Sequence, residues 1–327
     1  MKYLALIFLT FFAFSQPIQM HERFLTEIER MEEDFIWEVE NTKPFNEFRL
    51  SWNAIRLEDV QNAIYISLKQ EGEWSPWLYY ADWGGMGQML GTETFPSSSA
   101  ITSRGVAKPV QGKCGGFRCK ISAKGRGNLR GMYHLNVCLT DLSSFRPTFS
   151  ISDLETVQLK NFLGISWISM KSSRYLDFSM PISSICATQF LKQESISPIA
   201  FIENILEAYS DCYEEWEINA AECFHHLENK YRVSVQRLND FSSLHSYLKN
   251  GMPVLAQIKG SISGGSRPYR TPHTICVIGY LAEENKVLCM DCGFLRDYGT
   301  IVKYPVLDFL KAWEKCSNMA IVFSKNG

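Results

Sequence analysis

The chain has 327 residues, of which 46% are hydrophobic and 21% are charged, and its formal net charge is −2. This composition is that of a globular protein with a buried core, and it excludes a disordered or fibrous chain. A net charge this close to zero gives no reason to expect nucleic acid as a partner.

The first 15 residues have the pattern of a signal peptide. Lys2 precedes an apolar stretch over residues 3–14, and Ala13 and Ser15 are small side chains of the kind that a signal peptidase reads. Beyond this segment no apolar run is long enough to span a bilayer. We therefore expect an exported protein of the periplasm, envelope or extracellular medium, with no stable transmembrane segment after cleavage. An uncleaved anchor or an N-terminal core helix is the alternative.

Residues 16–43 are highly charged and are expected to form a leader segment that begins as a helix. Residues 44–170 contain short runs of alternating apolar and polar residues between clusters of Gly, Pro, Ser and Asn. These runs are EFRLSWNAI, NAIYISLK, WLYYADWG, GFRCKISA, MYHLNVCLTD and TVQLKNFLGISWISM. Runs of this kind predict an antiparallel β-sandwich. Five of its aromatic residues either line a groove for an envelope or surface ligand or pack in the core: Trp74, Trp77, Tyr79, Tyr80 and Trp83.

The spacing of apolar residues changes from the alternation of strands to the pattern of helices at the start of residues 171–327. PIAFIENILEAYS and EEWEINAAECFHHLENKY have helical spacing, and Asp240 is expected to cap a third helix, FSSLHSYLKN. PVLAQI, HTICVIGY, KVLCMD, TIVKYPV and NMAIVFS then read as strands, and LDFLKAWEK as a helix before the last strand. Helices followed by an antiparallel sheet predict an α+β domain.

Three residues of this second domain have the types needed for catalysis by a thiol. Cys186 is expected to open a short helix, CATQFLKQES, whose positive end favours the thiolate. His273 begins a strand after the Gly- and Pro-rich segment 259–272, and Asp291 ends the next strand. A hairpin would place Asp291 beside His273, where the carboxylate orients the imidazole that accepts the thiol proton. The pattern predicts a catalytic triad that needs no cofactor and no metal.

Short motifs of this domain occur in an order known from one family. Residues 185–188 read ICAT, residues 272–280 read PHTICVIGY and residues 290–292 read MDC. They resemble the Trp-Cys-Ser-Pro-Thr, Gly-His-x-x-x-Val-x-Gly-Phe and Asn-Asp-Pro motifs of the exported relatives of bacteriocin-processing cysteine peptidases, in the papain-like clan. In that family the nucleophile opens a helix. The resemblance implies a papain-like cysteine peptidase domain, without a transporter, that acts on peptide or protein substrates.

The chain departs from that family at the oxyanion site. The family places a Gln shortly before the nucleophile, whereas no Gln occurs between Arg174 and Cys186. The Cys186 N–H remains a donor, and Ser183 or Ser184 is a candidate for a second. Where it has been measured, loss of one oxyanion donor lowers turnover by about 10²–10³-fold. A catalytically degenerate papain-like module that binds peptides is therefore the main alternative.

A structural zinc site is a further alternative. His273, Cys276, Cys289 and Cys292 have H-x2-C and C-x2-C spacing, which suits zinc. However, His273 and Cys276 would leave a strand on opposite faces.

Other polar and cysteine pairs have simpler interpretations. Glu222 and the adjacent His225 and His226 do not form a metalloprotease motif, and we expect them on a solvated helix surface. In an oxidising compartment, residues 114 and 119 and residues 289 and 292 are candidate disulfide pairs.

Overall fold

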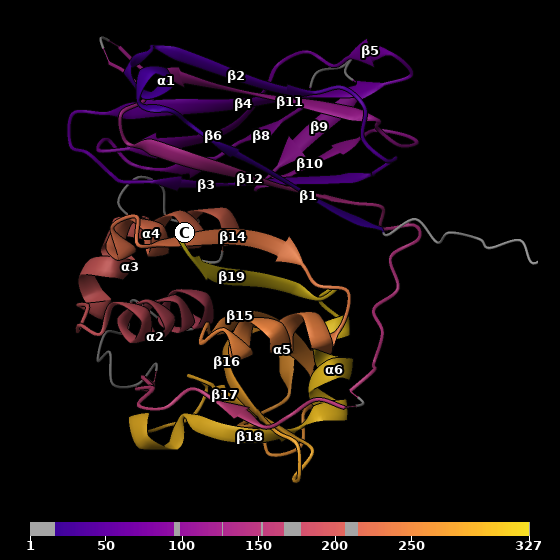
Figure 1. Cartoon of the computed structure of the whole chain (residues 1–327), viewed down its shortest axis with the longest axis vertical. Helices are drawn as coiled ribbons and strands as arrows, with labels where there is room; N and C mark the ends of the chain where they lie inside the picture. The colour runs from indigo at the N-terminus through magenta and orange to yellow at the C-terminus, as the bar shows by residue number, and fades with distance from the viewer. Residues whose placement is uncertain are drawn as a thin grey trace, which may run out of the picture.

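A computed structural model describes residues 17–94, 99–125, 127–151, 153–166, 178–206 and 215–326. The predicted signal peptide, residues 1–15, lies outside the described residues. In Figure 1 the first half of the chain forms two stacked sheets, and the second half surrounds a third sheet with helices. Within the described ranges, no helix combines the length and the apolar character that crossing a membrane requires.

The first half of the chain folds into two antiparallel sheets. One has the strand order β1 (Ile18–Phe24), β12 (Met132–Thr140), β3 (Glu47–Ala54), β10 (Val106–Pro109), β9 (Ala100–Ser103) and β8 (Thr92–Glu93). The other has the order β2 (Asp34–Val39), β11 (Gly116–Ala123), β4 (Gln61–Gln70), β6 (Leu78–Gly84) and β7 (Met89–Leu90), with β5 (Glu73–Trp74) beside β4. Phe48 of β3 contacts Tyr80 and Phe117 of the other sheet, and Trp52 contacts Trp83. The sheets therefore pack face to face, as the predicted β-sandwich requires.

The helix expected at the start of the leader segment, residues 16–43, is found only in part. The segment supplies strands β1 and β2, and only α1 (Glu27–Met31) between them is helical. β1 pairs with β12 along its whole length, and β2 pairs with β11. The many Glu and Arg residues resemble a helix surface, but they alternate with apolar residues and so also suit a strand with one exposed face.

The third sheet and its helices confirm the predicted α+β class. The sheet has the order β14 (Tyr231–Arg237), β19 (Met319–Lys325), β15 (Val254–Gly260), β16 (Tyr269–Leu281), β17 (Lys286–Met290) and β18 (Ile301–Pro305), with β13 (Val157–Gln158) beside β16. The helices are α2 (Ser179–Lys192), α3 (Pro198–Leu206), α4 (Trp216–Leu227), α5 (Phe241–Lys249) and α6 (Val306–Glu314). Asp240 caps α5 by accepting a hydrogen bond from the Ser243 N–H, as predicted.

Two strands of the third sheet differ from the prediction. β14 occupies a segment for which no strand was expected. In the run TVQLKNFLGISWISM only Val157–Gln158 is a strand, and it pairs with β16 rather than with the sandwich; residues 167–170 of this run lie outside the described ranges.

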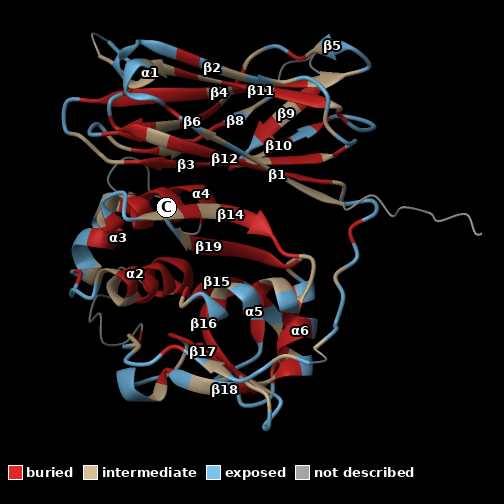
Figure 2. Ribbon diagram, in the orientation of Figure 1, coloured by how far each residue is buried: buried red, intermediate tan, exposed pale blue. Residues whose placement is uncertain are grey.

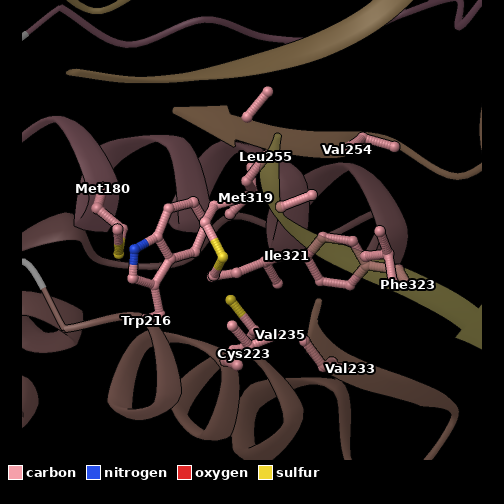
Figure 3. Packing of buried hydrophobic residues seen from close by; sticks show 14 of the residues in the cluster. Met180, Trp216, Cys223, Val233, Val235, Val254, Leu255, Met319, Ile321 and Phe323 are labelled. Carbon is pink, nitrogen blue, oxygen red and sulfur yellow. The ribbon is translucent and has the colours of Figure 1, made fainter. Parts of the chain in front are cut away.

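Helix α2 begins seven residues earlier than predicted. It starts at Ser179, so the expectation that Cys186 opens this helix is wrong. Pro181 lies in the first helical turn, where a missing N–H costs no intrahelical hydrogen bond. Met180 points into the core, where it lies near Trp216 and Cys223 of α4 (Figure 3). Figure 2 shows that most of α2 and α4 is buried.

The sandwich covers the edge of the third sheet that β14 forms. Asn53 of β3 donates to the Val233 carbonyl at 2.6 Å and accepts from the Val233 N–H at 3.0 Å. The Ser51 hydroxyl accepts from the Val235 N–H at 3.1 Å. Because β14 is the last strand of its sheet, these side chains take the place of a neighbouring strand.

Helix α4 carries acidic side chains that pair with arginines of the sandwich. Arg49 pairs with Glu217 at 2.8 Å, and Arg56 pairs with Glu222 at 2.5 Å. Both glutamates are fully buried, so the expectation of a solvated surface at Glu222 is wrong. The two halves of the molecule are thus joined by buried polar contacts.

Candidate active site

The end of β17 places the predicted carboxylate beside the predicted histidine. The last residues paired between β16 and β17 are Cys276 and Met290, and Asp291 follows directly. His273 Nε2 lies 2.8 Å from Asp291 Oδ1. His273 is 7% exposed and Asp291 is fully buried. The structure therefore brings together two of the three residues predicted for catalysis.

Asp291 is held as a carboxylate by four donors. Its Oδ1 accepts from His273 Nε2 and from the Gly293 N–H, and its Oδ2 accepts from the hydroxyls of Tyr269 and Tyr304 at 2.5 and 2.6 Å. Burial alone would raise the pKa of Asp291, but the hydrogen bond and charge of His273 and the two tyrosine hydroxyls together hold it below its ordinary value. The ionised carboxylate places the imidazole proton on Nε2, which leaves Nδ1 to accept a proton.

Tyr269 also fixes the plane of the imidazole. Its ring stacks on His273 with the centroids 4.1 Å apart and an interplanar angle of 4°. Burial and the neighbouring Asp291 charge raise the pKa values of Tyr269 and Tyr304, so both remain neutral phenols that donate to the carboxylate. An imidazole fixed in tautomer and orientation suits a general base.

The third predicted residue, Cys186, is not hydrogen-bonded to this pair in the described part of the chain. It is in the middle of α2, 1% exposed, and interacts electrostatically with Cys276. Cys276 and His273 leave β16 on opposite faces because they are three residues apart in a strand. Among the described residues, the interactions of Cys186 are with Ile165, Asp297 and Cys276 and do not include His273. Burial raises the pKa of the Cys186 thiol to about 12, although a backbone hydrogen bond with Ile165 partly opposes this.

Two polar side chains near the pair were not predicted to act there. The Ser179 hydroxyl accepts a hydrogen bond from the N–H of Thr274, the residue after His273, at 3.0 Å. Cys292 is buried, and one donor atom each of His273, Asp291 and Cys292 lie within 4.8 Å of one another. Pro181 could have indicated the position of Ser179 from the sequence, because proline favours the first turn of a helix and so marks a helix start near residue 179.

The donor set does not suit zinc. Of the four residues with zinc spacing, only His273 and Cys292 belong to a potential ligand group found among the described residues. The third member of that group, Asp291, already accepts four hydrogen bonds, which uses the lone pairs that a metal would need.

The remaining candidates from the sequence have structural surroundings. Tyr80 and Trp83 are buried in the sandwich core. Trp74 and Trp77 are partly exposed, and the Arg118 guanidinium lies over both rings, 4.7 and 4.5 Å from their centroids.

The candidate disulfides are absent from the structure. Cys114, Cys119 and Cys289 are buried and are not in disulfide bonds, so neither candidate pair is formed.

A comparison with known protein families gives a match that covers the histidine and the carboxylate. Residues 190–321 match the model of the Peptidase_C39 like family. The match includes His273 and Asp291, and it begins after both Ser179 and Cys186. No curated protein matches the chain. The second half of the chain thus resembles the cysteine peptidases related to the C39 family, which supports a peptidase type of function and a peptide or protein substrate.

Proposed function

We propose that this chain is an exported hydrolase of peptide bonds in which His273 acts as general base and acid and Asp291 orients its imidazole. The observation that carries the proposal is the 2.8 Å contact between His273 Nε2 and Asp291 Oδ1, within the segment that matches a peptidase family. A base prepared in this way activates a nucleophile at its second ring nitrogen. Cys186 is the nucleophile proposed from the sequence. It lies two helical turns beyond Ser179, the residue of α2 that accepts a hydrogen bond from the Thr274 N–H.

A digestion experiment tests the proposal. The chain from residue 16 onward is incubated with a peptide library, and the new peptide termini are identified by mass spectrometry. We expect cleavage by the wild type and none by His273→Ala. His245→Ala is a matched control, because His245 is also a buried histidine with one hydrogen bond, but it lies on α5 and donates from Nε2 to the Glu155 carbonyl. Equal cleavage by His273→Ala and the wild type would refute the proposal.

A peptide-binding module without chemistry is the second candidate. The burial and raised pKa of Cys186 favour it, because a thiol with a pKa of about 12 is almost entirely protonated at neutral pH. This candidate is supported if the library experiment yields saturable peptide binding without cleavage.

Export is proposed from residues 1–15 alone. Sequencing the N-terminus of the protein recovered from the periplasmic or extracellular fraction tests it, and we expect the mature chain to begin at residue 16. A chain that keeps Met1 and stays in the cell would contradict export.

A further inference from the structure

The first turn of α2 lies against the part of β16 that β17 leaves unpaired. The Thr274 N–H donates to Ser179 Oγ at 3.0 Å, and Ser183 Oγ donates to the Thr274 carbonyl at 3.1 Å. These contacts fix the start of the helix against the peptide unit that follows His273. We propose that Ser179 supplies the attacking oxygen of this site, so that the chain acts as a serine-type hydrolase on a papain-like scaffold. This inference rests on the proposed peptide hydrolysis and identifies its nucleophile.

The Ser179 hydroxyl lies close to the backbone of His273. The Thr274 nitrogen is about 2.4 Å from the His273 Cα in standard backbone geometry, so Ser179 Oγ lies at most about 5.5 Å from that Cα. An imidazole can bridge such a gap. Cys186 follows seven residues later, which is a rise of about 10 Å along the helix axis. Ser179 therefore lies closer than Cys186 to the backbone of His273, and the proposal requires the imidazole Nδ1 to meet its hydroxyl, since no hydrogen bond joins the two among the described residues.

The hydrogen-bonding state of Ser179 suits a nucleophile. A serine hydroxyl has one proton to donate and two lone pairs, and the Thr274 N–H occupies one lone pair. The hydroxyl proton thus stays available for His273. Ser179 is only 4% exposed, so the exchange takes place where solvent screening is weak.

The same helical turn offers donors for the oxyanion. The N–H groups of Ser179 and Met180 lie in the first turn of α2, where backbone donors have no intrahelical acceptor. The helix dipole adds positive potential at this end. Two such N–H groups can stabilise a tetrahedral oxyanion, and this arrangement does not need the side-chain amide that the sequence lacks.

The reaction balances with groups that are present. As Ser179 Oγ bonds to the substrate carbonyl carbon, its proton moves to His273 Nδ1. The scissile C–N bond then breaks, and His273 protonates the leaving amine. Water, deprotonated by His273, attacks the resulting ester and releases the acid and the free hydroxyl. Asp291 remains ionised throughout.

A fluorophosphonate, which forms a covalent bond with activated serine hydroxyls, tests this assignment. The full mature chain is treated with the probe, and fragmentation mass spectrometry locates the adduct. We expect one adduct at Ser179 that disappears in Ser179→Ala and in His273→Ala. Thr188→Ala is the matched control, because Thr188 is a buried hydroxyl on the same helix that donates to the Ser184 carbonyl; its adduct yield should equal that of the wild type. Absence of a His273-dependent adduct at Ser179 would overturn the proposal.

A gain-of-reactivity variant provides a second measurement. In Ser179→Cys, a vinyl sulfone should label residue 179 and leave the native Cys186 and Cys223 unmodified. Labelling of Cys186 or Cys292 in the wild type would overturn the assignment while leaving peptide hydrolysis intact, because the nucleophile would then be a thiol. Conversely, a His273-dependent adduct at Ser179 without cleavage of any peptide would support the assignment and refute the proposed substrate class.

Discussion

Asp291 has more hydrogen-bond donors around it than a structural carboxylate in a turn requires. Only one of the four comes from the imidazole; the others are the Gly293 N–H and two tyrosine hydroxyls. They keep the carboxylate ionised and in one position, and through it they determine which imidazole nitrogen is free. Gly293 has no side chain that would crowd this arrangement: a Cβ there would lie 2.9 Å from Asp291 Oδ1.

Replacing Asp291 by Asn, which has nearly the same shape, should show how far catalysis depends on the orientation and tautomer of His273. In Asp291→Asn the amide can present its NH₂ to His273 and favour the wrong tautomer, so we expect kcat for peptide cleavage to fall by about 10²–10⁴-fold. Tyr304→Phe, which removes one of the four hydrogen bonds but keeps the charge, should lower kcat much less. An Asp291→Asn variant with wild-type kcat would mean that the pair does not act in catalysis.

Two of the three residues predicted for catalysis lie together because strand connectivity determines their positions. A strand, a short turn and a second strand bring His273 and Asp291 together whatever the remaining chain does. The position of Cys186 depended on where a helix begins, and helix starts are less well determined by local sequence. Here Phe178, the N-cap residue, makes no side-chain capping bond, so the usual signal for a helix start was missing.

At the scale of elements, α5 and the leader segment show where sequence reasoning succeeds and fails. Asp240 is a strong cap followed by a clear apolar face, and the helix occurs where expected. Residues 16–43 supply strands because the sandwich offers β11 and β12 as partners, and pairing with residues 78 or more positions away cannot be read from local composition. β14 was missed for the same reason: its edge is completed by side chains of β3.

The covered edge of β14 provides a test at this scale. Asn53→Ala removes the partner of the buried Val233 N–H and the short hydrogen bond to its carbonyl, so we expect the free energy of unfolding to fall by about 2–4 kcal/mol. Asn136→Ala is the comparison, since Asn136 is equally buried but contacts the same carbonyl only at 3.5 Å, with a second contact of 3.2 Å to His134 Nδ1. Chemical denaturation measures both, and equal losses would show that Asn53 has no special role in covering the edge.

At the scale of the whole molecule, the sandwich and the peptidase-like half form one structural unit. Gly105 approaches Glu217 so closely that a Cβ there would lie 2.1 Å from Oε2. Arg49 and Arg237 of opposite halves each hold a buried glutamate of the other half, Glu217 and Glu47. A fragment limited to residues 44–170 would lack β1 and β2, so tests of surface binding by the sandwich need the full chain.

The junction of the two halves should make stability depend on pH. Burial raises the pKa of Glu217 to about 7, against the opposing attraction of Arg49. Between about pH 4.5 and 7, Glu217 therefore keeps its proton in the folded chain but has released it in the unfolded chain. The stabilisation is complete below about pH 4.5 and is lost as the pH rises to about 7. We expect the wild type to lose up to about 3 kcal/mol over this interval relative to Glu217→Gln.

A neighbouring glutamate supplies the control for this titration. Glu222 is equally buried on α4, but its pKa is lowered: burial opposes the shift, and the His226 hydrogen bond and Arg56 charge outweigh it. Its contribution is lost only as the pH falls below about 4.5, so Glu222→Gln should leave the slope between pH 4.5 and 7 unchanged. Denaturation at a series of pH values compares the three proteins; equal slopes for Glu217→Gln and the wild type would contradict the assignment.

The most direct measurement is the location of the acyl group on the protein during turnover. Rapid acid quenching of the mature chain with a peptide ester, followed by fragmentation mass spectrometry, identifies the residue that carries the acyl group. We expect the acyl group on Ser179 in the wild type and no acyl group on the His273→Ala variant. An acyl group on Cys186 or Cys292, or substrate turnover that continues unchanged without His273, would contradict it.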